Sequence, residues 1–153
     1  MSIIKPFTNI MLLTIIMPLF SCSGQRPLNL GISDGNFSPC PSSTNCISSD
    51  ADDERHKTLP FQFKVTANTA WKTARESLLK LPRTVIVTET PDYIHAECTS
   101  AVFRFVDDLE LHLRPSDGII AVRSASRLGH SDFGVNRKRI ETLRNALIIS
   151  NNF

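Results

Sequence analysis

The sequence predicts an α+β fold, a two-layer sandwich in which two helices lie on one face of a mostly antiparallel sheet. Runs with the residue pattern of strands follow one another through short turns, which is typical of antiparallel hairpins. Two apolar stripes with helical spacing flank four of these runs. The predicted order is therefore β-α-β-β-β-β-α. A composition of 41% hydrophobic and 21% charged residues is that of a globular domain.

The first strand and the first helix are predicted within residues 61–82. Residues 61–66 alternate between apolar and polar side chains, as a half-buried strand does. Asn68 or Thr69 can then cap a helix, and Pro82 ends it. The apolar stripe of this helix consists of Trp71, Ala74, Leu78 and Leu81. We expect that stripe to pack on the sheet.

Three strands are expected next. Residues 84–88 and 93–98 are rich in β-branched or aromatic side chains, and a Thr-Pro-Asp turn separates them. Between residues 102 and 114, apolar side chains mostly take odd positions and charged ones even positions, the pattern of a strand with two different faces. Asp107 is the exception. Either a bulge beside Asp108 turns it outward, or it is buried and needs a partner.

The last strand and the last helix follow a turn at residues 115–118. In the strand at residues 119–126, Ser124 and Ser126 share one face with apolar residues, and Arg123 lies on the other face. The next arginine, Arg127, continues the face of Arg123. Ser131 or Asp132 can cap the final helix. The apolar stripe of that helix consists of Ile140, Leu143 and Leu147.

Residues 1–21 have the pattern of a secretory signal peptide. An apolar stretch at residues 7–20 follows Lys5 and is too short for a comfortable transmembrane helix. It ends at Leu19-Phe20-Ser21-Cys22, which resembles a bacterial lipobox, so we expect Cys22 to be acylated and to become the mature N-terminus. A plain export signal before an ordinary cysteine is the alternative. Ser23 resembles the outer-membrane sorting pattern, which predicts an envelope lipoprotein that faces the periplasm.

Residues 22–58 are predicted to be a lipid-anchored tether with a disulfide loop, followed by the α+β domain at residues 59–153. Cys40 and Cys46 enclose a short turn, so they can pair at little entropic cost in an oxidising compartment. Cys98 lies in a strand-like run and is expected to be a buried thiol. The cysteine spacing is unusual for zinc and His56 is the only nearby imidazole, so we expect neither metal nor cofactor.

A polar cluster is predicted around residues 123–139, which hold five of the seventeen Lys and Arg residues. A strand that leads through a glycine-containing loop into a capped helix resembles an anion-binding site. In the alternative, which we favour, the arginines pair internally with acidic residues of the neighbouring strand and of the loop. The residues of the candidate cluster are Asp107, Asp108, Glu110, Arg123, Ser124, Ser126, Arg127, Ser131, Asp132, Asn136 and Arg137.

Three segments together resemble a known family. They are residues 39–49, which contain both loop cysteines, residues 105–108 with the sequence Phe-Val-Asp-Asp, and residues 123–139. The resemblance spans about Leu30 to Phe153 and is to an uncharacterised family, the domain of unknown function numbered fourteen ninety-nine, found in exported bacterial and plastid proteins. Thr44 stands where the family pattern has Pro. Because the family has no established activity, the resemblance implies a domain outline and no mechanism.

The sequence favours a non-enzymatic envelope lipoprotein whose polar cluster binds a small anion or an envelope protein. A small hydrolase that uses Asp107, Asp108 and Glu110 is the alternative. The adjacent residues 130–132 include triad residue types, but neighbours in one turn cannot form a nucleophile–base chain. A formal net charge of +2 gives no electrostatic footprint for nucleic acid.

Overall fold

The structure, a computed structural model, describes residues 24–153. The expected signal peptide and the expected lipidation at Cys22 lie outside the described residues. Among residues 24–153, no helix has both the length and the apolar character needed to cross a bilayer.

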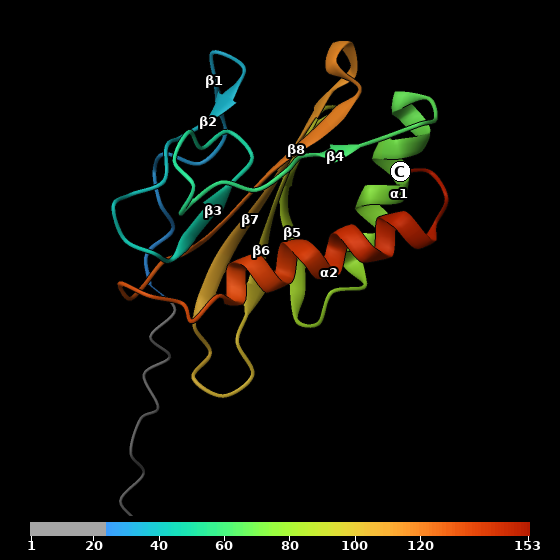
Figure 1. Cartoon of the computed structure of the whole chain (residues 1–153). Coiled ribbons are helices and arrows are strands. Elements are labelled where there is room, and N and C mark those ends of the chain that lie inside the picture. The colour runs from blue at the N-terminus through green and yellow to red at the C-terminus, as the bar shows by residue number, and fades with distance from the viewer. Residues whose placement is uncertain (1–23) are drawn as a thin grey trace, which may run out of the picture.

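Two helices and an antiparallel sheet form the fold, as predicted (Figure 1). A six-stranded sheet has the order β3-β8-β7-β6-β5, with β4 paired to the start of β8, and all its strand pairs are antiparallel. The strands are β1 (Ile32–Ser33), β2 (Asn36–Phe37), β3 (Cys46–Ser48), β4 (Phe61–Gln62), β5 (Thr84–Glu89), β6 (Tyr93–Thr99), β7 (Val106–Arg114) and β8 (Ile119–Ser126). The helices are α1 (Ala67–Leu79) and α2 (Val135–Ile149), and a single 3-10 turn, η1 (Pro115–Asp117), joins β7 to β8.

Both helices begin near the predicted positions, but with different caps. Thr66, and not Asn68 or Thr69, is the N-cap of α1, and its hydroxyl accepts a hydrogen bond from the amide of Thr69 at 3.3 Å. Gly134 is the N-cap residue of α2 and has a left-handed backbone with φ of 79°. A glycine takes that conformation without the clash that a Cβ would cause. The carboxylate of Asp132 still binds the first turn of α2, as described below.

The apolar core lies between the two helices and one face of the sheet. Leu109 and Leu111 of β7 are fully buried on this face, as their odd positions predict. The helices contribute Ala70, Trp71, Ala74, Leu78, Ile140, Leu143 and Leu147 to the same core. Burying one leucine or isoleucine side chain contributes about 1.5–3 kcal/mol, so this core is the main source of stability.

The second face of the sheet is also covered, which the sequence analysis did not predict. Asp108, Glu110 and His112 of β7 point away from the helices, yet they are only 1%, 1% and 9% exposed. Residues 24–58 lie over them, and β3, which lies within these residues, is an outer strand of the sheet paired with β8. The segment assigned to a tether and a loop therefore packs on the sheet and adds β3 to it, while β1 and β2 pair with each other. Its strands have two or three residues, too few to produce a visible sequence period.

The link between β6 and β7 also differs from the prediction. The alternating pattern places Phe103 and Phe105 in a strand, but β7 begins only at Val106. Residues 100–105 form a loop that is closed by two hydrogen bonds: the Ser100 amide donates to the Phe105 carbonyl at 2.8 Å, and the Phe105 amide donates to the Ser100 hydroxyl at 2.9 Å. The two phenylalanines are consequently exposed at one end of the sheet.

Candidate functional site

The predicted polar cluster divides between the two faces of the sheet. Consecutive residues of a strand point to opposite faces. One group lies on the face under residues 24–58 and consists of Asp108, Glu110, Arg123 and Arg127. Tyr93, His95 and Glu97 lie on the same face, and we call these seven residues the polar layer. Asp107, Ser124, Ser126 and Asn136 lie on the helix face. Ser131, Asp132 and Arg137 lie in the loop before α2 or in its first turn. The sequence cluster is therefore not one site.

Arg127 and Asp108 form the central pair of the polar layer. Arg127 Nε donates to Asp108 Oδ2 at 2.9 Å, and Nη2 donates to Asp108 Oδ1 at 2.7 Å and to Glu97 at 2.6 Å. His95 Nε2 lies 2.8 Å from Asp108 Oδ1. Burial favours the neutral acid, but the hydrogen bonds from His95 and Arg127 outweigh that effect and hold the pKa of Asp108 below its usual range. The hydrogen bond to Asp108 in turn raises the pKa of Arg127.

Glu110 is the second buried acid of the polar layer. Arg123 Nη1 donates to Glu110 Oε2 at 2.8 Å, while the Tyr93 hydroxyl and the backbone amide of Gly31 donate to Oε1, each at 2.8 Å. Burial, followed by the negative charge of Glu110, raises the pKa of Tyr93. Arg123 Nε is the one buried side-chain polar atom without a hydrogen-bond partner in residues 24–153. Glu110 thus connects two strands to the segment that covers them.

Two further ion pairs fasten residues 24–58 to the sheet. Arg114 forms a bidentate pair with Asp50 at 2.9 and 2.6 Å, and Arg26 Nη2 lies 2.6 Å from Glu97. Residues 50–57 belong to the segment that the sequence predicts to be a tether and a loop. The structure instead buries His56, whose ring nitrogens lie 2.8 Å from Asp53 Oδ2 and 2.9 Å from the Ser43 carbonyl. An alternating or helical period cannot signal such contacts because they arise from irregular backbone.

On the helix face, Asn136 is the centre of a second network. Its side-chain oxygen accepts hydrogen bonds from Ser124 at 2.6 Å and from Arg139 at 2.5 Å, and its amide donates to Ser126 at 2.9 Å. Arg139 Nη2 also donates to Asp107 Oδ2 at 2.5 Å. Asp107 is therefore buried with a partner and not turned out by a bulge. That partner is Arg139, which the sequence analysis did not name among the site residues.

The expected anion site at the start of α2 already holds a carboxylate of the chain. Asp132 Oδ1 accepts from the Gly134 amide at 3.0 Å, and Oδ2 accepts from the Asn136 amide at 2.7 Å. Ser131 Oγ accepts from the Phe133 amide at 3.4 Å. Contrary to the internal-pairing hypothesis, Arg137 pairs with no acid among residues 24–153. It donates to the backbone carbonyls of residues 55 and 57, each at 3.0 Å.

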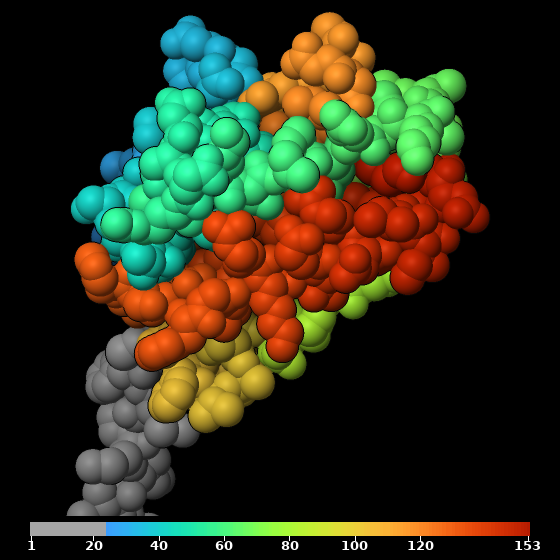
Figure 2. All heavy atoms as spheres, in the orientation of Figure 1, coloured from blue at the N-terminus to red at the C-terminus, as the bar shows by residue number. Residues whose placement is uncertain are grey.

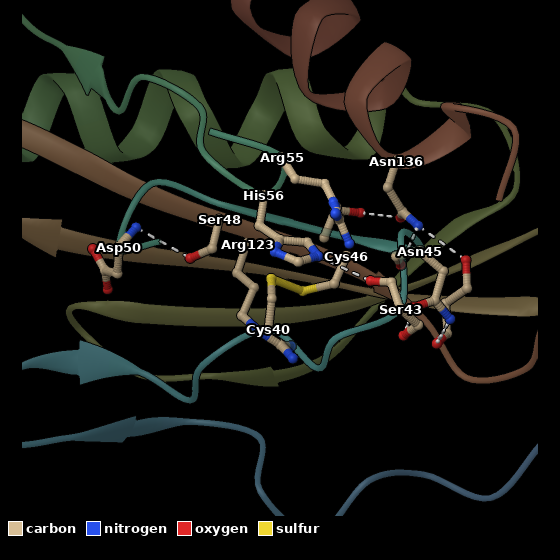
Figure 3. Close-up of a disulfide and its surroundings, with 12 residues drawn as sticks. Cys40, Ser43, Asn45, Cys46, Ser48, Asp50, Arg55, His56, Arg123 and Asn136 are labelled. Atoms are coloured by element: carbon tan, nitrogen blue, oxygen red, sulfur yellow. Dashed lines mark hydrogen bonds between the residues drawn. A yellow bond between two sulfur atoms is a disulfide. The ribbon is translucent and has the colours of Figure 1, made fainter. Parts of the chain in front are cut away.

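Cys40 and Cys46 form a disulfide beside the polar layer, as the sequence predicted (Figure 3). Their Cα atoms are 5.6 Å apart.

Cys98 is a free, buried thiol, and burial raises its pKa. Within the described range 24–153, no group of three or more His, Cys, Asp or Glu side chains is placed to hold a metal ion.

A cavity of about 410 Å³ lies at the end of the sheet where β6 ends and α2 begins. Arg83, Lys138 and Arg139 contribute its positive charge, and Thr84, Ser100 and Thr142 contribute hydroxyl groups. Arg139 is engaged by Asp107, whereas Arg83 and Lys138 form no ion pair among residues 24–153. Two cations without an ion pair therefore line this hollow of the surface.

One comparison with known proteins identifies a family. The model of a protein family of unknown function, DUF1499, matches residues 36–147, which include β2 to β8 and most of α2. No curated protein matches the chain. The match begins at β2, so residues 36–58 of the covering segment, with the disulfide, lie inside the family domain. On this match over most of its length, the chain is a member of the DUF1499 family.

Proposed function

We propose that this protein is an exported lipoprotein of the cell envelope, held on the outer membrane by lipid on Cys22, whose domain is a non-enzymatic binding or structural module. The observation that supports a non-enzymatic role is the internal pairing of the charged side chains. Arg123, Arg127 and Arg139 each donate to a carboxylate of the same chain. In these pairs the charged groups that a reaction would need as acids and bases already bind each other. Together with the pairs made by the covering segment, they hold that segment, the sheet and α2 together.

A hydrolase based on Asp107, Asp108 and Glu110 has less support. A general acid or base must lie within hydrogen-bond reach of its substrate. Asp108 and Glu110 are each 1% exposed, and both oxygens of each carboxylate already have partners. The burial and the pairing therefore favour a structural role for these acids.

We assign the binding of a small anion to the cavity beside Arg83 and Lys138. The start of α2 is less suitable because Asp132 already accepts hydrogen bonds from its amides. The arginines of the polar layer are less suitable because acids of the chain neutralise them. In the cavity, Lys138 is exposed and has no ion pair within the described part of the chain, so an added carboxylate or phosphate can approach it.

Mass spectrometry of the mature protein tests the lipid anchor. We expect the N-terminal peptide to begin at Cys22 and to carry the mass of acyl chains. Cys22→Ser is the matched control, because it removes the sulfur that is acylated and leaves the apolar segment intact; it should carry no lipid. An unmodified N-terminus downstream of Cys22 would reject the anchor.

A further inference from the structure

We propose that one end of the domain docks directly on a phospholipid bilayer, in the leaflet that holds the lipid on Cys22. This inference rests on the lipid anchor proposed above. The docking surface, which we call the loop-tip surface, belongs to the β6–β7 loop, the β8–α2 loop and the first residue of α2. Its apolar residues are Val102, Phe103, Phe105, Leu128, Phe133 and Val135.

The loop-tip surface is unusually apolar for exposed loops. Of the twelve large apolar side chains that are exposed in residues 24–153, six belong to it. Phe133, Val102 and Phe103 are 97%, 79% and 70% exposed. The rings of Phe103 and Phe105 stack with their centres 5.5 Å apart, so they present one joint apolar surface. Large exposed apolar groups gathered in one place mark an interaction site.

These loops lie at the same end of the sheet (Figures 1 and 2). Thr99 at the end of β6 pairs with Val106 at the start of β7, and the Arg127 amide donates to the Val106 carbonyl at 3.3 Å. The cavity described above includes both Ala101 and Val135, which connects the first loop to the start of α2. The apolar tips therefore project from a single end of the domain.

The described chain begins at this same end of the domain, next to the proposed lipid anchor in the sequence. A Cβ placed on Gly24 would lie 2.9 Å from Cβ of Arg127 and 3.1 Å from Cγ of Leu128, so the backbone of Gly24 lies against the β8–α2 loop. Cys22 precedes Gly24 by two residues, and two residues span at most about 7 Å. Acyl chains on Cys22 would hold the loop-tip surface close to the lipid headgroups.

The charges beside the apolar tips suit an anionic bilayer. Arg83, Arg104 and Lys138 lie at this end, and none of them forms an ion pair within residues 24–153. Cations next to embedded apolar side chains are attracted by anionic phospholipids. The charge also favours a bilayer over a second copy of the chain, because a symmetric dimer would bring these cations together.

Tryptophan quenching in vesicles tests the docking. The full-length mature protein carries either Phe103→Trp or Ile149→Trp and is reconstituted into vesicles of phosphatidylethanolamine and phosphatidylglycerol with brominated acyl chains. Ile149 is 80% exposed at the other end of α2, about 21 Å along the helix from Val135, so it is the matched control. Trp71 is buried in both variants. We expect Phe103→Trp to lose emission relative to unbrominated vesicles, and Ile149→Trp to keep it.

A charge-reversed version of the reporter tests the role of the cations. Adding Arg104→Glu and Lys138→Glu to Phe103→Trp should reduce the loss of emission in vesicles that contain phosphatidylglycerol. Equal quenching of the two reporters, or quenching of neither, would overturn the docking. Without vesicles and in the unlipidated Cys22→Ser background, an emission shift of Phe103→Trp that depends on protein concentration would overturn it in favour of a second copy.

The mass spectrum of the same sample separates the two proposals. Lipid on Cys22 together with equal behaviour of the two reporters overturns the docking and leaves the anchor in place. An unmodified Cys22 overturns the anchor, and the docking with it.

Discussion

At the scale of single residues, two neighbouring aspartates have opposite surroundings. Asp107 points to the helix face and meets Arg139, whereas Asp108 points to the polar layer and meets Arg127. The side chains of Arg127 and Asp108 are 5% and 2% exposed and those of Arg139 and Asp107 are 13% and 10% exposed, so the charges of the first pair depend most on each other. Removing one member of a buried pair leaves the other charge uncompensated, which costs more than the intact pair contributes.

Acid should destabilise the protein partly through Asp108. Its pKa is lower in the folded state than in an unfolded chain, so its contribution to stability is present above about pH 4 and is lost as the pH falls through the folded pKa. Glu97, which Arg127 and Arg26 hold ionised against the effect of burial, acts in the same direction. We expect the free energy of unfolding to fall below about pH 4.

The variant Asp108→Asn isolates this contribution. It should be less stable at pH 7, and its free energy of unfolding should fall less steeply between about pH 5 and pH 2, because the charge that acid removes is already absent. Asp117→Asn, at an exposed position in η1, is the control and should keep the native slope. Denaturant unfolding at several pH values measures these slopes. Equal slopes for Asp108→Asn and the native protein would contradict the assignment.

At the scale of elements, the disulfide supports a strand that is too short to hold its place by itself. β3 has three residues, and Cys46 at its start pairs with Ala125 of β8. A disulfide between residues six positions apart closes a small loop, and its loss should cost about 2 kcal/mol by the chain-entropy relation. We expect the double variant Cys40→Ser with Cys46→Ser to lower the free energy of unfolding by this amount.

Alkylation of the folded protein checks the cysteine assignment directly. Cys98 should resist the reagent because it is buried, and Cys40 and Cys46 should react only after reduction. Rapid labelling of Cys46 in the absence of reductant would contradict the pairing.

The sequence predicted the elements that have a regular period and missed those that have none. Ile140, Leu143 and Leu147 form the core stripe of α2, and the two faces of β7 follow the alternation of its residues. β3 was missed because three residues cannot show a period. Residues 102–105 were assigned to a strand because their alternation continues into β7, but the hydrogen bonds of Ser100 close them into a loop.

The candidate site was predicted in its residue types and not in its arrangement. Arginines and acids do pair across β7 and β8, as the internal hypothesis states. The partner of Asp107 was missed, although one signal was present: Arg139 lies three residues after Asn136, which places both on one side of α2. The contribution of residues 24–58 could not be predicted, because pairs such as Asp50 with Arg114 join irregular segments that are far apart in sequence.

At the scale of the whole molecule, both faces of the sheet are covered, one by apolar contacts and the other by polar contacts. The helices cover one face with an apolar core, and residues 24–58 cover the other through ion pairs and hydrogen bonds to the polar layer. Arg83, Arg104 and Lys138, which form no ion pair among residues 24–153, lie beside the loop-tip surface. The described chain begins at the same end of the domain. This arrangement supports an account in which the interior charges stabilise the fold and one end of the surface meets a ligand or a bilayer.

Thermal unfolding of Arg127→Ala with and without phosphate tests that account most directly. We expect a loss of about 3–5 kcal/mol, since Asp108 stays buried without its main partner, and partial recovery when Asp108 is also replaced by Ala. The stabilisation by phosphate should persist in Arg127→Ala and disappear in Lys138→Ala, which should otherwise melt like the native protein. An unchanged melting temperature for Arg127→Ala, together with loss of its response to phosphate, would contradict the account and make Arg127 part of an anion site.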